Sequence, residues 1–353
     1  MTTIKRNEGY RLPAEWEPQS GIQLTWPHAG TDWKPYLKEI TDTFVELVRE
    51  FARREQVLIV TPDVESTRSK ITEQLGNDVL LNITFFECET NDTWARDHGA
   101  ITMVSEHIEG DKIEKYRLLD FRFNGWGEKF DWEKDNAITR QLSTGGVLSG
   151  TLESHDDFVL EGGAIESDGH GTVMTTSTCL LAPHRNQPLD REDIELRLRE
   201  WFNAERIVWL DHGQLIGDDT DGHIDTLVRM APDNTLLYVG CDDESDPQFA
   251  ELYAMEEELR ALRTLQGNPY RLLRLPMPRA IYYDDDRLPA TYANFVILNE
   301  AVIVPTYGQP DLDEEAMDLV GQAFPDREIV GIDAKVVVRQ HGSLHCLTMQ
   351  QPK

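Results

Sequence analysis

Residues 222–240 read GHIDTLVRMAPDNTLLYVG, in which a polar, glycine-containing start runs into a strand, turns, and returns as a second strand. Four other stretches of the chain follow the same plan. They are WARDHGAITMV at 94–104, LEGGAIESDGHGTVMTT at 160–176, YANFVILNEAVIVPTYG at 292–308 and GSLHCLTMQ at 342–350. A weak repeat of this size indicates supersecondary units that recur about an axis.

The five units also share a polar residue at comparable places. These anchor residues are Asp97, Glu161, His223, Asn294 and Cys346. The steps between them are 64, 62, 71 and 52 positions. If each hairpin starts at the same place in its unit, all five side chains point toward one central site. The repeat therefore predicts the position of a functional site as well as a fold.

Helices and strands alternate along the whole chain, which predicts the α/β class. Apolar residues at helical spacing predict helices over 40–51, 194–202, 252–262 and 316–324. Asp190 is expected to cap the second of these helices, and Pro247 to occupy the first position of the third. The strands are expected at 57–60, 80–86, 100–104, 116–121, 207–210, 236–239, 295–298 and 301–305. No linker rich in Gly, Ser or Pro divides the chain, so we expect a single domain over 1–353.

The charge balance excludes several classes of partner. The chain carries 34 Lys+Arg against 64 Asp+Glu, a formal net charge of −30. Such a field repels nucleic-acid phosphates and anionic membranes and attracts small cations. No apolar run approaches the roughly 18 residues of a membrane span. The start, MTTIKRNEGYRLPAEW, lacks the apolar core of a secretory signal.

The four cysteines, Cys88, Cys179, Cys241 and Cys346, are far apart and show no CxxC spacing. A disulfide framework and a structural zinc site are both poor interpretations of this pattern. We expect a reducing, cytoplasmic location, where a free thiol can be kept for chemistry.

The anchors combine a thiol, an imidazole and carboxylates. A thiol with an imidazole is typical of a nucleophile with a general acid and base. Additional carboxylates are useful if the electrophile is a cation, and a planar guanidinium is the cation that carboxylates hold by paired hydrogen bonds. The pattern therefore indicates a guanidine carbon as the target.

Each anchor also has a plainer interpretation. Cys346 alone is more often a small buried apolar residue, and His223 with Asp225 could be half of a metal site. Asp97 could form an ion pair with its neighbour Arg96. Glu161 could be a turn residue before two glycines.

Taken together, the motifs resemble a known family. NDTWARDHGAI, FNGWGEKF, LEGGAIESDG, TDGHIDTLVR and HGSLHCLT occur in the order seen in the agmatine deiminases, or agmatine iminohydrolases. These belong to the bacterial-type peptidylarginine deiminase group of the guanidine-modifying superfamily. The opening RLPAEWEPQSGIQLTWPH is also similar to the family's N-terminal signature. The resemblance runs from about residue 10 to the end and implies the pentein fold, a five-bladed α/β propeller of pseudo-repeats.

The resemblance implies a role for each motif residue. Cys346 in LHCLT matches the nucleophile, and His223 in GHID matches the general acid and base. Asp97 in WARD and Asp225 in GHID match the guanidinium clamps. Glu161 in LEGG matches a carboxylate that binds and tunes the site near the histidine.

The substrate-binding residues follow in the same way. Trp94 matches an aromatic residue that lines the substrate slot, where a cation on the ring face is favourable. Gly342 lies in the loop before the nucleophile, which is glycine-rich in many agmatine deiminases but here reads HGSLHC. Asp219 lies where the family tends to carry a glutamate and is expected to bind the distal amine of the substrate. Asp218 and Asp221 are alternatives for that role, and a solvated acidic loop is the plain interpretation.

The implied reaction is hydrolysis of agmatine to N-carbamoylputrescine and ammonia through a thiouronium adduct, a step of polyamine biosynthesis. It needs no metal, nucleotide or redox cofactor. Alternatives on the same fold are deimination of peptidyl-arginine or free arginine, and amidino transfer. A non-catalytic pentein that binds a macromolecule and a metallohydrolase are alternatives of other classes. The sequence leaves open whether the chain forms a homo-oligomer.

Overall fold

The computed structural model describes residues 9–106 and 115–353, in which sheets and helices alternate along the chain. Residues 1–8, part of the stretch interpreted as lacking a signal, and residues 107–114 lie outside the described parts. The mixed α/β class is confirmed. Within the described residues the strands pair into separate sheets and do not close into one barrel.

Five sheets of three or four strands in the described residues share one plan. An inner strand pairs antiparallel with a middle strand, and the middle strand pairs parallel with the next. The first sheet contains β1 (Tyr10–Arg11), β5 (Ile101–Ser105), β6 (Tyr116–Arg122) and β7 (Thr151–Val159). The second contains β8 (Glu166–Ser167), β9 (Thr172–Thr176) and β10 (Arg206–Leu210). The third contains β11 (Val228–Ala231), β12 (Thr235–Val239) and β13 (Arg271–Leu275).

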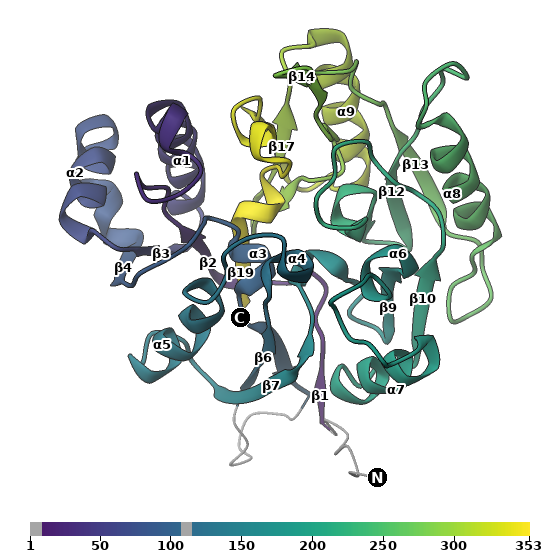
Figure 1. The fold of residues 1–353 in the computed structure, drawn as a ribbon, viewed down its shortest axis with the longest axis horizontal. Helices are drawn as coiled ribbons and strands as arrows, with labels where there is room; N and C mark the ends of the chain where they lie inside the picture. The colour runs from purple at the N-terminus through teal and green to yellow at the C-terminus, as the bar shows by residue number, and fades with distance from the viewer. Residues whose placement is uncertain (1–8, 107–114) are drawn as a thin grey trace.

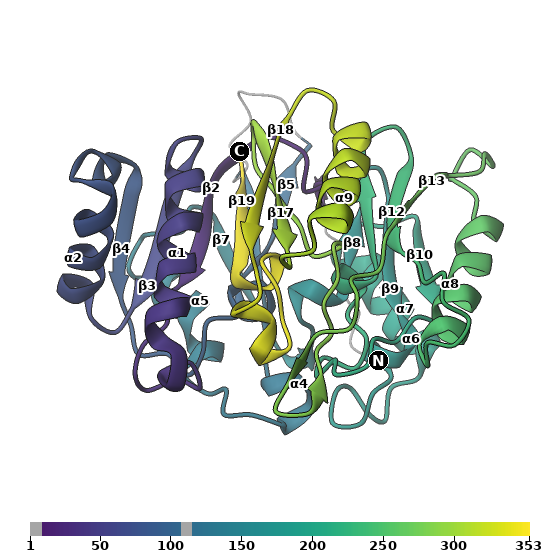
Figure 2. The same ribbon diagram turned by 90° about the horizontal axis from the view of Figure 1, so that it is seen from above.

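The fourth and fifth sheets complete the set. The fourth contains β16 (Val296–Ile297), β17 (Ala301–Thr306) and β18 (Glu328–Asp333). The fifth contains β2 (Gln19–Thr25), β3 (Gln56–Thr61), β4 (Ile83–Glu87) and β19 (Thr348–Pro352), so it joins the two ends of the chain. Thr348 lies opposite Leu24 in the β19–β2 pair, and Figure 2 shows the two strands side by side. A hairpin of β14 (Tyr282–Tyr283) and β15 (Asp286–Arg287) stands apart.

The longer helices lie at the outside of the molecule, and two of the short ones lie near its centre. Figure 1 shows α3 and α4 in the middle of the view, with α1, α2, α7, α8 and α9 around the periphery. The helices are α1 (Leu37–Ala52), α2 (Val64–Leu75), α3 (Ala95–His98), α4 (Gly125–Glu128), α5 (Ile138–Thr144), α6 (Ser177–Leu180), α7 (Arg191–Trp201), α8 (Phe249–Ala261) and α9 (Pro310–Ala323).

Two of the local predictions are wrong. Helix α8 begins at Phe249, not at Pro247, because the Asp246 carboxylate accepts the backbone N–H of Gln248 in a preceding turn and pairs with Arg287. The strand expected at 80–86 begins only at residue 83, because residues 78–82 form a 3-10 helix. The Asp190 cap of α7 is confirmed, since its side chain accepts the backbone N–H of Asp193 and forms a capping box.

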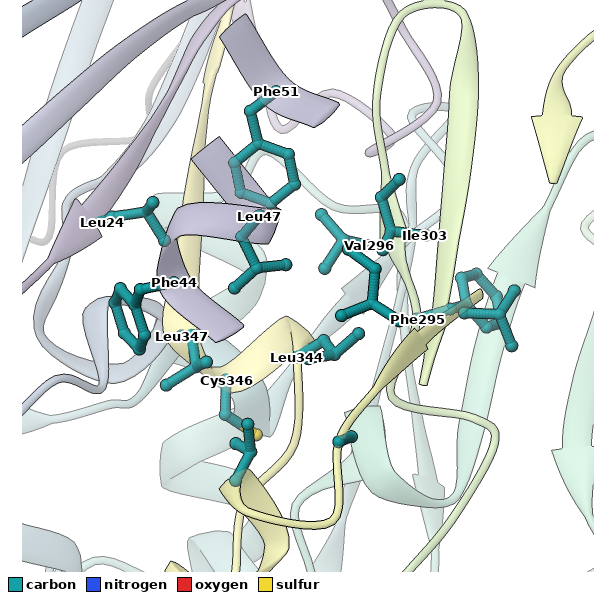
Figure 3. Close-up of a cluster of buried hydrophobic side chains, with 14 of the residues drawn as sticks. Leu24, Phe44, Leu47, Phe51, Phe295, Val296, Ile303, Leu344, Cys346 and Leu347 are labelled. Atoms are coloured by element: carbon teal, nitrogen blue, oxygen red, sulfur yellow. The ribbon is translucent and has the colours of Figure 1, made fainter. Parts of the chain in front are cut away.

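A large apolar cluster supports one wall of the prospective site. Leu24 on β2, Leu47 and Phe51 on α1, and Leu344 and Leu347 near the end of the chain all belong to it and are buried. Figure 3 shows Cys346 at the edge of this cluster, next to Leu344 and Leu347. Burying one such side chain stabilises the fold by about 1.5–3 kcal/mol. The backbone that carries Cys346 is therefore fixed by packing on both sides.

Within residues 9–106 and 115–353, the helices are too short or too polar to cross a membrane.

Candidate active site

The anchor residues gather around a pocket with about 140 Å³ of free space. A water molecule occupies roughly 30 Å³ in the liquid, so the pocket has room for a small elongated molecule. Cys346 and Asp97 lie in its lining together with three aromatic side chains. The other lining residues are Asp92, Trp94, Trp126, Phe130, Asp219, Thr220, Gln340, His341 and Gly342.

Cys346 lies in the 3-10 helix His345–Leu347, directly before β19, and is buried. Its Sγ lies 3.4 Å from Asn294 Oδ1 and 3.8 Å from Asp225 Oδ2. Burial raises the pKa of the Cys346 thiol well above its usual value, and the charges of Asp225 and Asp97 raise it further. The thiol is therefore protonated when the pocket holds no cation.

His223 precedes the 3-10 helix Ile224–Thr226 and is fully buried. Its Nδ1 lies 3.7 Å from Asp97 Oδ1, and neither ring nitrogen has a hydrogen-bond partner among the described residues. Burial lowers the pKa of His223, but the neighbouring Asp97, Cys179 and Glu161 outweigh it and hold that pKa well above its usual value. The imidazole thus carries a proton at neutral pH that it can donate.

Asp97 on α3 is held by two neutral donors. Its Oδ1 accepts the backbone N–H of Gly163 at 3.1 Å, and its Oδ2 accepts the Trp126 indole N–H at 3.0 Å. Burial raises the pKa of Asp97 to about 6, an effect that His223 opposes and that Asp225 and Glu161 reinforce. A Cβ on Gly163 would lie 2.6 Å from His223 Nδ1, so only glycine allows this close approach.

Asp225 is held instead by a cationic partner. His345 Nδ1 lies 2.7 Å from Asp225 Oδ2, whereas Asp225 Oδ1 is buried and has no hydrogen-bond partner among the described residues. Burial alone would raise the pKa of Asp225, but the hydrogen bond and charge of His345 lower it below its usual value. One oxygen of an ionised carboxylate is therefore left for a ligand.

Glu161 precedes the 3-10 helix Gly162–Ala164 and is fully buried. It forms an ion pair with Arg185, whose Nε lies 2.8 Å from Glu161 Oε1, and Arg185 also pairs with Asp221 at 2.9 Å. Glu161 therefore lies beside the histidine as the family motif implies, and it also occupies the turn before the glycines.

Cys179, Glu161 and His223 each offer a metal-binding atom, and these atoms lie within 4.8 Å of one another. A thiol, a carboxylate and an imidazole form a set that zinc accepts. However, the guanidinium of Arg185 already pairs with Glu161, and a cation beside it would be repelled. We therefore assign no metal to this cluster.

The three acids of the distal loop have different partners. The Asp218 carboxylate accepts the backbone N–H groups of Thr220 and Gly222. Asp221 pairs with Arg185 and Lys129. Asp219 lines the pocket, with its Oδ2 3.6 Å from His341 Nδ1.

Burial raises the pKa of Asp219, which the charge of His341 opposes. Among the three acids, Asp219 is thus the one that lines the pocket. A basic residue, His341, therefore lies beside the acid that the sequence predicts for the distal amine.

Trp94 and Gly342 are in direct contact. A Cβ on Gly342 would lie 2.3 Å from Trp94 Cζ3, so the loop before the nucleophile can lie against the indole only because residue 342 is glycine. Trp94 in turn packs against Trp33 and Trp126, with ring centroids 5.7 and 6.5 Å away. These tilted and edge-to-face contacts hold the aromatic wall in place.

Four residues of the site were not identified from the sequence as functional. Trp126 and Arg185 hold Asp97 and Glu161, and His345 holds Asp225. Asn294 is one of the five repeat anchors, and the sequence assigns it no chemical role. Its Oδ1 accepts the backbone N–H of Cys346 at 3.3 Å. Trp126 lies in the family motif FNGWGEKF and His345 in HGSLHCLT. Their place in these motifs is the sign of a functional role that the sequence offers.

Repeated α/β sheets and a pocket lined by a buried thiol and carboxylates match the guanidine-modifying, or pentein, class that the motifs imply. A family model described as Porphyromonas-type peptidyl-arginine deiminase matches residues 11–352, and the chain belongs to that family. The resemblance and the enzyme class expected from the motifs are confirmed.

Individual relatives agree with this placement. A crystal structure described as the "Putative Arginine Deiminase from Porphyromonas gingivalis" has 46% identity and a TM-score of 0.90, with 98% of each chain covered. A cysteine-to-serine variant of agmatine deiminase from C. jejuni with substrate bound has 39% identity and a TM-score of 0.88, covering 98% of this chain and 96% of that one. A "Putative agmatine deiminase" from Marinomonas sp. (strain MWYL1) is 32% identical, covering 100% of this chain and 97% of its own length.

Proposed function

We propose that the protein hydrolyses agmatine to N-carbamoylputrescine and ammonia through a covalent adduct on Cys346. The observation that carries the proposal is the position of Cys346 Sγ, 3.8 Å from Asp225 Oδ2, in a pocket whose lining also includes Asp97. Two carboxylates beside one thiol suit a cationic electrophile. The C. jejuni agmatine deiminase variant that holds substrate has its cysteine replaced by serine, which supports a cysteine nucleophile here.

Binding of the guanidinium activates the thiol. The free Asp225 Oδ1 and the Asp97 carboxylate accept its N–H groups by charge-assisted hydrogen bonds. The arriving positive charge offsets the two carboxylates that disfavour the thiolate, so the Cys346 proton leaves to solvent. The two carboxylates that bind the substrate are thus the same groups that disfavour the thiolate when the pocket is empty.

The first half-reaction forms a carbon–sulfur bond and breaks a carbon–nitrogen bond. The thiolate attacks the central guanidine carbon and gives a neutral tetrahedral adduct. The protonated His223 transfers its proton to one nitrogen, which departs as ammonia. A cationic thiouronium remains on Cys346, and His223 is neutral.

The second half-reaction consumes water. Neutral His223 takes a proton from water as the oxygen adds to the thiouronium carbon. The carbon–sulfur bond then breaks, and the hydroxyl proton goes to the departing sulfur. The ureido product leaves, and both the thiol and the imidazolium are restored.

The selectivity for agmatine is assigned to the mouth of the pocket. Asp219 lies there with its carboxylate half-exposed, where it can pair with the distal ammonium of a dication. The overall charge of −30 favours a dication over zwitterionic arginine. We further propose that the five sheets are the blades of a five-bladed propeller around this pocket, in a cytoplasmic enzyme without a metal or organic cofactor.

The test is ammonia release from agmatine, arginine and a peptidyl-arginine, with each product identified by mass. We expect agmatine to exceed arginine by at least about a hundredfold in kcat/KM, which corresponds to roughly 2.7 kcal/mol. Equal turnover of arginine or peptidyl-arginine would overturn the assignment of agmatine. Transfer of the amidino group to an added amine would indicate the alternative amidinotransferase. Activity that survives chelation but is lost with iodoacetamide excludes the metallohydrolase alternative.

A further inference from the structure

The N-terminal segment RLPAEWEPQS, residues 11–20, has a signature without an assigned role. It passes beneath the active site and brings Glu15 to three cationic side chains. Arg96 Nη1 lies 2.9 Å from Glu15 Oε1, and Arg229 Nη2 lies 2.5 Å from Glu15 Oε2. His345 Nε2 lies 2.9 and 3.0 Å from the two Glu15 oxygens. One carboxylate therefore joins three separate parts of the chain.

Two of these cations adjoin reacting groups. Arg96 immediately precedes Asp97, and His345 immediately precedes Cys346. His345 also donates from Nδ1 to Asp225 Oδ2 at 2.7 Å. A continuous line of contacts thus runs from Glu15 through His345 to Asp225, whose Oδ2 lies 3.8 Å from Cys346 Sγ.

The contacts of His345 favour donation from both of its ring nitrogens. Both ring nitrogens lie at hydrogen-bond distance from a carboxylate, and ionised carboxylates can only accept. Arg229 Nη2 also lies 3.2 Å from Nε2, but it donates to Glu15 Oε2 at the shorter distance of 2.5 Å. The two carboxylates therefore favour a ring that donates from both nitrogens. The remaining carboxylate of the cluster, Glu166, pairs with Arg229. The cluster then balances three negative groups against three positive ones, and its members are Glu15, Glu166, Asp225, Arg96, Arg229 and His345.

We propose that Glu15 and His345 are positioning residues for the guanidine-binding Asp225. Glu15 keeps His345 charged, and His345 locks Asp225 Oδ2, so that Asp225 stays ionised with Oδ1 turned to the substrate. This role rests on the proposed function. The pKa directions agree with it: those of Glu15 and Asp225 both lie below their usual values, although both groups are buried.

The decisive variant is Glu15→Gln, which keeps the shape of the side chain and removes its charge. We expect kcat/KM for agmatine to fall about ten- to a hundredfold, mainly through KM, because Asp225 loses its charged support. The acidic limb of the kcat/KM profile should move to higher pH, since Asp225 then titrates in the working range. If Glu15 had only a structural role, Glu15→Gln would lower the melting temperature but leave the acidic limb of the kcat/KM profile at its original pH.

The matched control is Glu17→Gln in the same segment. Glu17 pairs with Arg11, with 2.5 Å between Glu17 Oε2 and Arg11 Nη2, and makes no contact with the cluster. We expect its kcat/KM and its pH profile to match the unaltered protein. Glu15→Asp, which restores the charge, should recover part of the activity and return the acidic limb toward its original pH.

A second readout separates this inference from the proposed function. The rate of Cys346 alkylation by an amidinium electrophile is compared with the rate for neutral iodoacetamide. A charged Asp225 should favour the amidinium reagent, and Glu15→Gln or His345→Gln should lower that preference at least fivefold. If no guanidine is deiminated but the preference falls, the proposed function fails and the positioning role stands. If KM, the pH profile and the alkylation preference are all unchanged in both variants, the positioning role is overturned.

Discussion

Asp97 and Asp225 both lie close to the Cys346 thiol, and their hydrogen-bond partners differ. Both are buried, but neutral donors hold Asp97, whereas the charged His345 holds Asp225. The pKa of Asp97 rises to about 6, while that of Asp225 falls below its usual value. The difference teaches that an imidazole at hydrogen-bond distance lowers the pKa of a buried carboxylate more than two neutral donors and a His223 ring 3.7 Å away can.

The two sides of the pocket also differ in how their charges are paired before substrate binds. The side beneath Asp225 has its charges paired before any substrate arrives. On the Asp97 side, His223 lies 3.7 Å away and has no hydrogen-bond partner among the described residues. We infer that the first side is preorganised and that the second is completed by the substrate cation.

Replacing Cys346 with Ala should have the largest effect, because it removes the reacting atom that both carboxylates face. We expect turnover to fall by at least about 10⁴-fold, a loss of the size seen when a catalytic nucleophile is deleted. Agmatine should still bind, because Asp97 and Asp225 remain, and calorimetry would measure that binding. The control is Cys241→Ala, which removes a buried thiol that is not part of the pocket lining. Activity within tenfold of the unaltered enzyme would overturn the assignment of the nucleophile.

Asp97→Asn and Asp225→Asn test the two sides against each other. An ion pair at about 4 Å is worth roughly 4 kcal/mol at an effective dielectric near 20, and competition from water reduces the net value. We expect kcat/KM to fall about 30- to 150-fold in each variant, which corresponds to about 2–3 kcal/mol. Asp225→Asn should also destabilise the fold more, because it removes one of the two carboxylates that pair with His345. Unchanged kcat/KM in both variants would make these acids structural only.

Asp219→Asn extends the comparison to the pocket mouth, where the pairing with His341 is longer, at 3.6 Å. A half-exposed ion pair contributes about 0.2–1 kcal/mol in the usual case and more when partly desolvated. We expect KM for agmatine to rise about tenfold with little change in kcat, while arginine is scarcely affected. Asp218→Asn is the matched control, since that carboxylate bonds backbone N–H groups instead. A larger loss in the Asp218 variant would assign the distal amine to that residue.

Trp126→Phe should produce the smallest effect, a shift in a pH profile. Substrate capture needs Asp97 ionised, so kcat/KM should fall as the pH drops through about 6, the pKa of Asp97. The indole N–H stabilises the ionised form at 3.0 Å, so its removal should raise that pKa and move the acidic limb to higher pH. The shift should not exceed about one unit, since a hydrogen bond is worth about 0.5–1.5 kcal/mol. A shift to lower pH would contradict this reading of Asp97.

The sequence predicted the parts of the site that recur in its repeats. Cys346, His223, Asp97, Glu161 and Asp225 all lie in hairpin starts, and repetition made those starts visible. The structure brings these residues together around one pocket or directly against its lining.

The supporting residues were not predictable in the same way. Glu15 and His345 are 330 positions apart, and no local period links them. Arg185 lies in an irregular stretch between prolines, where neither spacing nor alternation marks it. The start of helix α8 was misplaced because the Asp246–Arg287 ion pair, a contact across 41 positions, fixes the turn before it. Local residue patterns predict individual helices and strands. Ion pairs between residues far apart in the sequence form only in the folded chain, so local patterns do not predict them.

The pairing of β19 with β2 has a consequence for how the enzyme acquires its activity. This pairing and the Glu15–His345 contact both span more than 300 positions. Contacts of such separation form slowly, because a long loop must close before they are gained. During refolding from denaturant, secondary structure should therefore return before catalysis does. The interval between the recovery of the far-ultraviolet signal and the recovery of ammonia release would then measure the time needed to form these long-range contacts.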